Sequence, residues 1–241
     1  LQMIRTYSGK TVSFGLQTGE FTARNVILTA GLPGFEILHN GAFFCKVQLS
    51  VPGRHNVGNA LAAAAACFAD GIPPEIIGRG LSEYAGAKRR FEYHCTVNGA
   101  VVADDYGHHP DAYAVTFRTA RDLGFRRIIA IHQPHTFSRT KLLMDDFVKI
   151  LSTVDKVLIP PIYAARETND EYQVSSQDLV ARLPNAEFVP DFEAIADRIK
   201  EQLLDAGVKS AIINLGGNVL CVGEKPDGSK FNIGLQKPFA D

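Results

Sequence analysis

The spacing of apolar residues changes character twice along the chain. Residues 3–50 contain short runs in which apolar and polar residues alternate, at 11–14, 21–29 and 42–49, separated by Gly, Asn and Pro. Alternation with a period of two is typical of strands, so we expect this part to be rich in β-structure. Residues 57–69 are dominated by Ala and Leu and predict a helix. A second helix is expected from Pro73 to about Tyr84, because proline suits a first helical turn.

From Cys95 onward, short apolar runs alternate with longer amphipathic segments. The expected strands cover residues 96–103, 127–131, 156–159, 187–189 and 210–214, and the expected helices cover residues 111–123, 141–152, 176–182 and 192–206. This alternation predicts an α/β fold with a doubly wound, largely parallel, Rossmann-like sheet that binds ligands at the carboxyl ends of its strands. The basic segment 87–92 marks the expected boundary between a domain at 1–88 and a domain at 89–241.

Composition narrows the range of partners. The 241 residues carry 25 Lys and Arg against 26 Asp and Glu, so nothing indicates the basic face of a nucleic-acid-binding protein. No apolar run approaches the roughly 18 residues of a membrane span. The four cysteines lie far apart without a Cys-x-x-Cys pair, so we expect buried thiols in a reducing compartment. The chain starts at Leu1 without a signal segment, which suggests that it is trimmed.

Ser8-Gly9-Lys10-Thr11 contains the Gly-Lys-Thr of a phosphate-binding loop. Such a loop requires a glycine five residues earlier and a helix directly after the threonine. The earlier position is Ile4, and the residues after Thr11 alternate as a strand does. We therefore expect a hairpin turn here.

His55, Asn56 and Asn59 cluster at the start of the alanine-rich helix. Two explanations stay open. Asn and His are good residues for capping a helix. Asn amides also offer paired donor and acceptor groups, which the edge of an adenine requires.

Residues 104–110 read Asp-Asp-Tyr-Gly-His-His-Pro and lie between an expected strand and an expected helix. A carboxylate at the end of a strand, here Asp105, can accept hydrogen bonds from ribose hydroxyls. Metal binding by His and Asp is an alternative, as is a purely structural role for Asp105 and His109. No third ligand shows helical spacing, so we expect no metal site in this chain.

Residues 131–140 read Ile-His-Gln-Pro-His-Thr-Phe-Ser-Arg-Thr and also lie between a strand and a helix. Arg139 in this position can bind a carboxylate through a bidentate fork. The alternative is a surface ion pair for Arg139 and a packing role for His135. Histidines in two successive strand-to-helix loops favour a binding site.

Three weaker features complete the set. The segment Lys88-Arg89-Arg90-Phe91-Glu92 could reach a polyphosphate or could be a solvated linker. Residues 163–167, Tyr-Ala-Ala-Arg-Glu, follow the expected strand at 156–159. Gly216-Gly217-Asn218 follows the last expected strand, where glycines often only form a turn.

In this order, the segments resemble the cytoplasmic Mur ligases of peptidoglycan synthesis, over residues 1 to about 220. The segment PGRHNVGNALAAAAA resembles the end of the family's central ATP-binding domain, and KRRFE resembles the join to its carboxyl-terminal domain. DDYGHHP and QPHTFSRT resemble the first two substrate loops of that last domain. The resemblance implies that residues 1–88 are an incomplete central ATP-binding domain and that residues 89–241 are a Rossmann-like, amino-acid-binding domain.

Within the family, DDYGHHP with QPHxxxR is similar to the member that joins L-alanine to UDP-N-acetylmuramate. The murein-tripeptide recycling ligase has a different second loop and is the alternative. The resemblance implies ATP, UDP-N-acetylmuramate and L-alanine as substrates and Mg²⁺ as cofactor, with an acyl phosphate as the intermediate. It assigns adenine to His55, Asn56 and Asn59, the γ-phosphate to Arg90, ribose to Asp105, and alanine to Tyr106, His108, His135 and Arg139, with Arg90, His108 and His135 as catalytic residues.

The chain departs from the family pattern at several positions. The second loop usually reads QPHRYTRT, so Thr136 replaces an arginine that would bind the carboxylate, and Phe137 replaces a tyrosine. Gly58 stands where a larger apolar residue is usual, at a cost of up to about 1 kcal/mol relative to Ala. Asn218 stands where an Asp is usual.

The true phosphate-binding loop, the magnesium ligands and a uridine-binding domain are expected outside these 241 residues. We therefore expect no turnover by the chain alone, and a cytoplasmic location as for the family. A non-catalytic module that binds a nucleotide or an amino acid is the rival hypothesis. Exposed apolar edges within residues 1–50 could drive homodimer formation.

Overall fold

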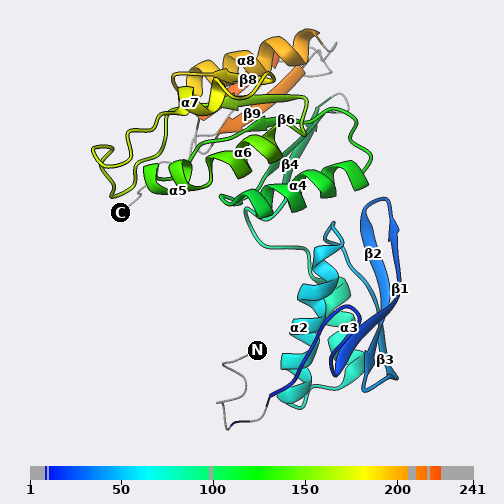
Figure 1. The fold of residues 1–241 in the computed structure, drawn as a ribbon. Helices are drawn as coiled ribbons and strands as arrows, with labels where there is room; N and C mark the ends of the chain where they lie inside the picture. The colour runs from blue at the N-terminus through cyan, green and yellow to red at the C-terminus, as the bar shows by residue number, and fades with distance from the viewer. Residues whose placement is uncertain (1–8, 10, 98–99, 206–209, 216–217, 224–241) are drawn as a thin grey trace, which may run out of the picture. The chain divides into compact units, whose positions relative to one another are not determined.

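The computed structural model describes residue 9 and residues 11–97, 100–205, 210–215 and 218–223. The chain divides into two compact units (Figure 1): a first unit of Leu1–Arg90 with Asp111–Ile128, and a second unit of Phe91–Pro110 with Ile129–Asp241. The boundary expected at residues 88 and 89 stays a prediction. Within the described ranges, no helix is both long and apolar enough to cross a membrane.

The first unit is built on a three-stranded antiparallel sheet in the order β1-β2-β3. The strands are β1 (Phe21–Thr29), β2 (Leu32–His39) and β3 (Ala42–Gln48). They are joined by two-residue turns at Ala30-Gly31 and Asn40-Gly41, in which all four residues have positive φ. Paired positive φ values are the mark of the hairpin turns that match strand twist.

Two helices, α2 (His55–Ala69) and α3 (Pro74–Glu83), cover one face of this sheet (Figure 1). Alternate strand residues such as Phe35, Ile37 and Val47 form the core together with Val57 and Leu61 of α2. The Cys45 thiol is buried in the same core, and desolvation raises the pKa of that thiol to about 11. The expected helices are confirmed here to within two residues.

The strand expected at residues 11–14 is wrong. Among the described residues there, only Phe14 pairs, in an isolated bridge with Phe21. Conversely, β2 was not expected, because Pro33 and Gly34 interrupt its apolar pattern. The hairpin turn expected at the Gly-Lys-Thr lies largely outside the described residues, since residues 1–8 and residue 10 are not among them.

The second unit contains a parallel sheet in the order β6-β7-β8. Its strands are β6 (Ile129–Ile131), β7 (Lys156–Ile159) and β8 (Ala186–Phe188). Val157, Leu158 and Ile159 are all fully buried, and because successive strand residues face opposite sides, both faces of the sheet are covered. The α/β fold class is confirmed.

Three further helices of this unit are α6 (Met144–Leu151), α7 (Ser176–Val180) and α8 (Phe192–Asp205). Ile195 of α8 packs on Leu158 of β7. Ser175 caps α7 through a reciprocal capping box with Asp178, which explains where this short helix begins.

Three expected elements of this unit divide differently in the structure. The strand expected at 96–103 is an antiparallel hairpin of β4 (Glu92–Val97) and β5 (Ala100–Asp104). The helix expected at 141–152 is two helices, α5 (Phe137–Leu142) and α6, separated by Leu143. The last expected strand, β9 (Ser210–Leu215), pairs antiparallel with β10 (Asn218–Gly223), so the parallel pairing covers only β6, β7 and β8 among the described strands.

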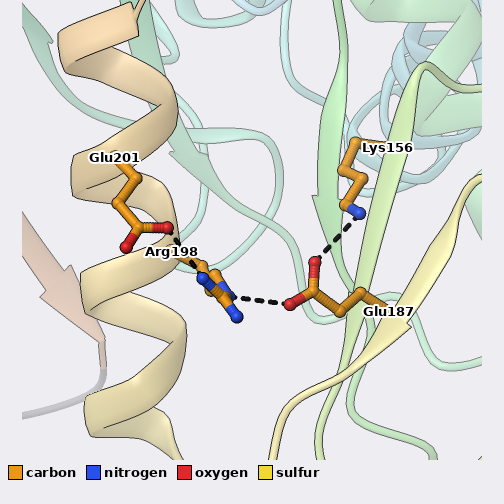
Figure 2. A network of polar contacts seen from close by, with 4 residues as sticks. All are labelled: Lys156, Glu187, Arg198 and Glu201. Carbon is orange, nitrogen blue, oxygen red and sulfur yellow. Dashed lines mark hydrogen bonds and ion pairs between the residues drawn. The ribbon is translucent and has the colours of Figure 1, made fainter.

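A network of charged side chains ties β7, β8 and α8 together (Figure 2). Glu187 accepts from Lys156 at 3.0 Å and from Arg198 at 2.7 Å, and Arg198 also reaches Glu201 at 2.8 Å. The hydrogen bond from Lys156 is the main reason that the pKa of Glu187 is lowered. These side chains are partly exposed, so screening by solvent keeps the contribution of each pair to stability small.

Candidate functional site

Three polar segments of the second unit follow β5, β6 and β7. We call them loop 105–109, loop 133–140 and loop 163–167 by their residue numbers. Strands β6 and β7 are neighbours in the parallel sheet, so their carboxyl ends lie at one edge, where ligands bind, whereas β5 belongs to the β4–β5 hairpin. The contacts below show that the three loops lie close together.

Asp105 organises the first of these loops. One carboxylate oxygen accepts the backbone N–H of Gly107 at 2.7 Å, and the other accepts the N–H of Phe91 at 3.0 Å. A carboxylate can accept about four hydrogen bonds. Asp105 therefore retains the capacity to accept from a ribose hydroxyl while it holds the loop.

Tyr106 and His108 stand on the same loop with exposed side chains. Their rings meet edge-on with 5.4 Å between centroids. The Nδ1 atom of His108 lies 3.0 Å from the carbonyl oxygen of Tyr106, which can only accept, so Nδ1 carries the proton. In the neutral ring, Nε2 of His108 is then a proton acceptor.

Loop 133–140 lies against this pair. The rings of His108 and His135 are 5.9 Å apart, and Nη1 of Arg139 lies 3.1 Å from Nδ1 of His135. A guanidinium only donates, so Nδ1 of His135 accepts and Nε2 carries the proton. The structure thus brings together Tyr106, His108, His135 and Arg139, the four residues predicted to surround one substrate, and gives the two imidazoles opposite hydrogen-bonding roles.

Loop 163–167 holds the two residues that sequence reasoning undervalued. The Tyr163 ring lies 5.5 Å from the His135 ring, and Glu167 binds Ser138 through both the backbone N–H and the hydroxyl. Hydrogen bonding from the Ser138 side chain, then from its N–H, lowers the pKa of Glu167. The available signal was position, because this loop follows the parallel strand next to β6.

His132 lies directly beneath loop 133–140, where β6 ends. It is 2 % exposed, and its ring lies 5.0 Å from that of Phe147 in α6. Burial disfavours the charged imidazolium and lowers the pKa of His132 to about 3. His132 is thus a neutral residue of the core rather than a proton carrier near neutral pH.

The predicted adenine-binding residues lie in the first turns of α2 in the first unit. The helix starts after Arg54, with no side-chain cap, so the capping explanation for His55 and Asn56 is wrong. Instead, Nδ2 of Asn56 donates to the Pro52 carbonyl at 2.7 Å, and its Oδ1 accepts from Asn59 at 2.8 Å. Asn59 is exposed. Among the described residues its amide oxygen has no hydrogen-bond donor, so this oxygen is available to a ligand.

Arg90 is exposed and ends the first stretch of the first unit. Its neighbours Arg89 and Phe91 have φ values of +59° and +46°, in the left-handed region that residues other than glycine seldom adopt. The role of Arg90 toward a phosphate stays a prediction, as do the ligands of the other predicted site residues.

One group among the described residues has the composition of a metal site. Glu92, His94 and Asp104 each present one ligand atom within 4.8 Å of the others, on the β4–β5 hairpin. It shares only Asp104 with the segment 104–110, and neither His108 nor His109 belongs to it. Carboxylates often gather on exposed surfaces without a cation, so this geometry alone assigns no metal.

Comparison with known proteins places the chain in a family. The model for the Mur ligase, glutamate ligase domain, matches residues 89–216, which is more than half of the chain. A second model, the ApbE family, matches residues 192–241 and overlaps the first from residue 192. All nine predicted site residues precede residue 192. The chain belongs to the Mur ligase family.

Individual relatives and solved structures match most of the chain. The chain is 38% identical over 232 residues to a UDP-N-acetylmuramate–L-alanine ligase of Acetivibrio thermocellus, which covers 93% of this chain and 49% of the relative. The solved UDP-N-acetylmuramate–alanine ligase of Thermotoga maritima is 27% identical, with a TM-score of 0.63 over 77% of this chain and 41% of that one.

A murein peptide ligase of Psychrobacter arcticus shares the fold, at 24% identity and a TM-score of 0.53 over 79% of this chain and 39% of that one. The chain spans about half the length of the curated relatives that it matches.

Proposed function

We propose that the chain is part of an ATP-dependent ligase that joins L-alanine to UDP-N-acetylmuramate. One observation supports this most strongly: Tyr106, His108, His135 and Arg139 gather from two loops, with the Arg139 guanidinium on His135 and the His108 ring beside that of His135. An amino acid has a carboxylate to be bound and an amine to be deprotonated. This set of side chains offers a group for each.

In the proposed reaction, ATP phosphorylates the muramyl carboxylate and leaves as ADP, and the alanine amine attacks the carbonyl carbon of the acyl phosphate. The tetrahedral intermediate collapses to the amide and inorganic phosphate. Arg139 binds the alanine carboxylate, and Nε2 of His108 accepts a proton from the amine. Nε2–H of His135 donates to an oxygen of the substrate, since Arg139 occupies its other nitrogen.

Asn59, Asn56 and His55 are proposed to bind adenine, Asp105 to bind ribose, and Arg90 to bind the γ-phosphate. Mg²⁺ would neutralise the polyphosphate. We assign its ligands, and the phosphate-binding loop, to the half of the relatives' length that this chain does not span. The Asn56–Asn59 amide pair supports the adenine assignment, because it presents an oxygen acceptor and N–H donors from one helix face.

A phosphate-release assay with ATP, Mg²⁺ and UDP-N-acetylmuramate tests this proposal. We expect turnover with L-alanine by the complete product of the encoding gene and none by the 241 residues alone. Faster turnover with the murein tripeptide would reassign the substrate to the recycling reaction. Binding of ATP or an amino acid without any turnover by the complete product would favour a binding module.

We also propose a cytoplasmic location and a homodimer formed through the edges of the first unit's sheet. Ile27 on β1 and Phe43 on β3, the two outer strands, are 65% and 62% exposed. Exposed apolar edge strands favour pairing with a second chain. Light scattering should show a concentration-dependent dimer that Ile27→Lys weakens, and an unchanged mass for that variant would contradict the proposal.

A further inference from the structure

We propose that Glu167 is a positioning residue for the acceptor amino acid, because it holds loop 133–140 in the conformation that orients Arg139. This inference rests on the proposed function of Arg139. It assigns a role to a loop that the predicted site did not include. Three sets of contacts carry it.

The first set is the carboxylate itself. One oxygen of Glu167 accepts the backbone N–H of Ser138 at 2.8 Å, and the other accepts the Ser138 hydroxyl. That hydroxyl also lies 3.1 Å from Oγ1 of Thr136. Ser138 belongs to the first turn of α5, where a negative charge is favourable. Glu167 therefore fastens the start of α5 to a segment 29 residues away.

The second set is a short parallel pairing of the two backbones. The Tyr163 N–H donates to the Pro134 carbonyl at 2.8 Å, and the Thr136 N–H donates to the Tyr163 carbonyl at 2.9 Å. His135 and Tyr163 are the bridge partners. Tyr163 and Glu167 thus bind loop 133–140 on both sides of Thr136.

The backbone of Thr136 is strained, with φ at +66° and ψ at 148°. A residue with a branched Cβ rarely adopts a positive φ, at a cost of about 1–3 kcal/mol. Such a conformation persists only when its surroundings impose it. Its hydroxyl accepts the N–H of Arg139 at 3.4 Å, so it starts the helix and does not replace the binding group of the arginine usual at this position.

The third set transmits this arrangement to Arg139. Its backbone is bound through Thr136, and its guanidinium reaches His135 at 3.1 Å. Both partners lie within the segment that Tyr163 and Glu167 hold. A displacement of about 1 Å at a reacting group can cost about 100-fold in rate. Loss of these contacts should therefore weaken the binding of the substrate carboxylate. Glu167 already accepts from Ser138 twice, which makes it a poor general base and favours a positioning role.

The test compares three variants with the wild type in the complete gene product. Glu167→Ala removes both acceptors. Glu167→Gln keeps the shape, with one oxygen to accept the Ser138 N–H and an amide N–H₂ to meet the hydroxyl. Glu187→Gln is the matched control, because Glu187 is another glutamate of the same unit that accepts two hydrogen bonds, and it lies in the network of Figure 2.

We expect Glu167→Ala to raise KM for L-alanine at least about 30-fold, with KM for ATP within about twofold and Glu167→Gln within about fivefold of wild type. Glu187→Gln should leave both KM values unchanged. Equal changes in the two KM values, or an effect of Glu187→Gln as large as that of Glu167→Ala, would overturn the proposal.

Amide hydrogen exchange in the 241-residue chain gives a readout that does not depend on the proposed reaction. The amides of Ser138 and Arg139 should exchange slowly in the wild type and in Glu187→Gln, and at least about tenfold faster in Glu167→Ala. Unchanged exchange would show that Glu167 does not hold loop 133–140. If the complete product accepts no amino acid but the exchange result holds, the proposed function fails and the role of Glu167 in ordering the loop stands.

Discussion

Residues 53–59 and loop 133–140 both carry side chains predicted to bind substrate, but they are held in different ways. At 53–59, Asn56 binds Pro52 and Asn59, four residues back and three ahead, so the first turns of α2 orient the amides by themselves. Loop 133–140 is held by Tyr163 and Glu167, more than 25 residues away. The first arrangement is local, and the second depends on the fold of the whole unit.

The largest expected effect tests the residue that the distant contacts orient. Arg139→Lys keeps the charge but loses the planar fork, so KM for L-alanine should rise about 100-fold. KM for ATP should not change. Arg198→Lys, in the network on α8, is the control and should change neither value. A change of less than threefold would mean that Arg139 does not bind the carboxylate.

The next effect concerns His132, which directly precedes loop 133–140 in the chain, and it depends on pH. His132 has a pKa of about 3 in the folded state, below its unfolded value of 6.5. The unfolded chain therefore binds the extra proton first, and stability falls as pH decreases from 6.5 toward 3. This residue should lower the free energy of unfolding by up to about 2 kcal/mol between pH 7 and pH 5.

Chemical denaturation at the two pH values measures this difference. His132→Gln should be less stable at pH 7 but should lose that part of the pH dependence. His94→Gln, at an exposed position of β4, should keep it. Equal pH slopes for the wild type and His132→Gln would show that His132 is not a buried neutral group.

A smaller effect tests the locally held region. Asn59→Ala removes one of the two amides but favours the helix, so KM for ATP should rise about tenfold without loss of stability. KM for L-alanine should stay the same. Loss of helix content, seen by circular dichroism, would show that the Asn56–Asn59 contact supports the structure rather than the ligand.

The smallest effect uses two glycines of the first unit. A Cβ added at Gly58 in α2 meets nothing within 4 Å, so Gly58→Ala should stabilise the unit by about 0.5–1 kcal/mol. A Cβ at Gly78 in α3 would come within 3.2 Å of Cys45, so Gly78→Ala should destabilise it. Thermal unfolding measures both. The same sign for both variants would contradict the packing described around α2 and α3.

The same contrast explains what could be predicted from the sequence. Strand β7 and helices α2, α3 and α4 (Pro110–Asp122) follow from local patterns, and their bounds agree with expectation to within about two residues. The start of α5 at Phe137 was missed, because the carboxylate of Glu167 binds Ser138 of its first turn from 29 residues away. The residues predicted for the site in loops 105–109 and 133–140 were chosen from their position after strands, and their roles stay predictions. Tyr163 and Glu167 could not be ranked without knowing which loops touch.

The thiol of Cys45 can serve as a chemical probe for transient opening of the first unit. A thiol with a pKa of about 11, 7% exposed, is almost wholly protonated at neutral pH and shielded from reagents. A maleimide should therefore modify it only when the unit opens, whereas the half-buried Cys67 should react without such opening. In a Cys67→Ala background, with the other two thiols also replaced by alanine, the labelling rate of Cys45 would report how often this unit comes apart in solution.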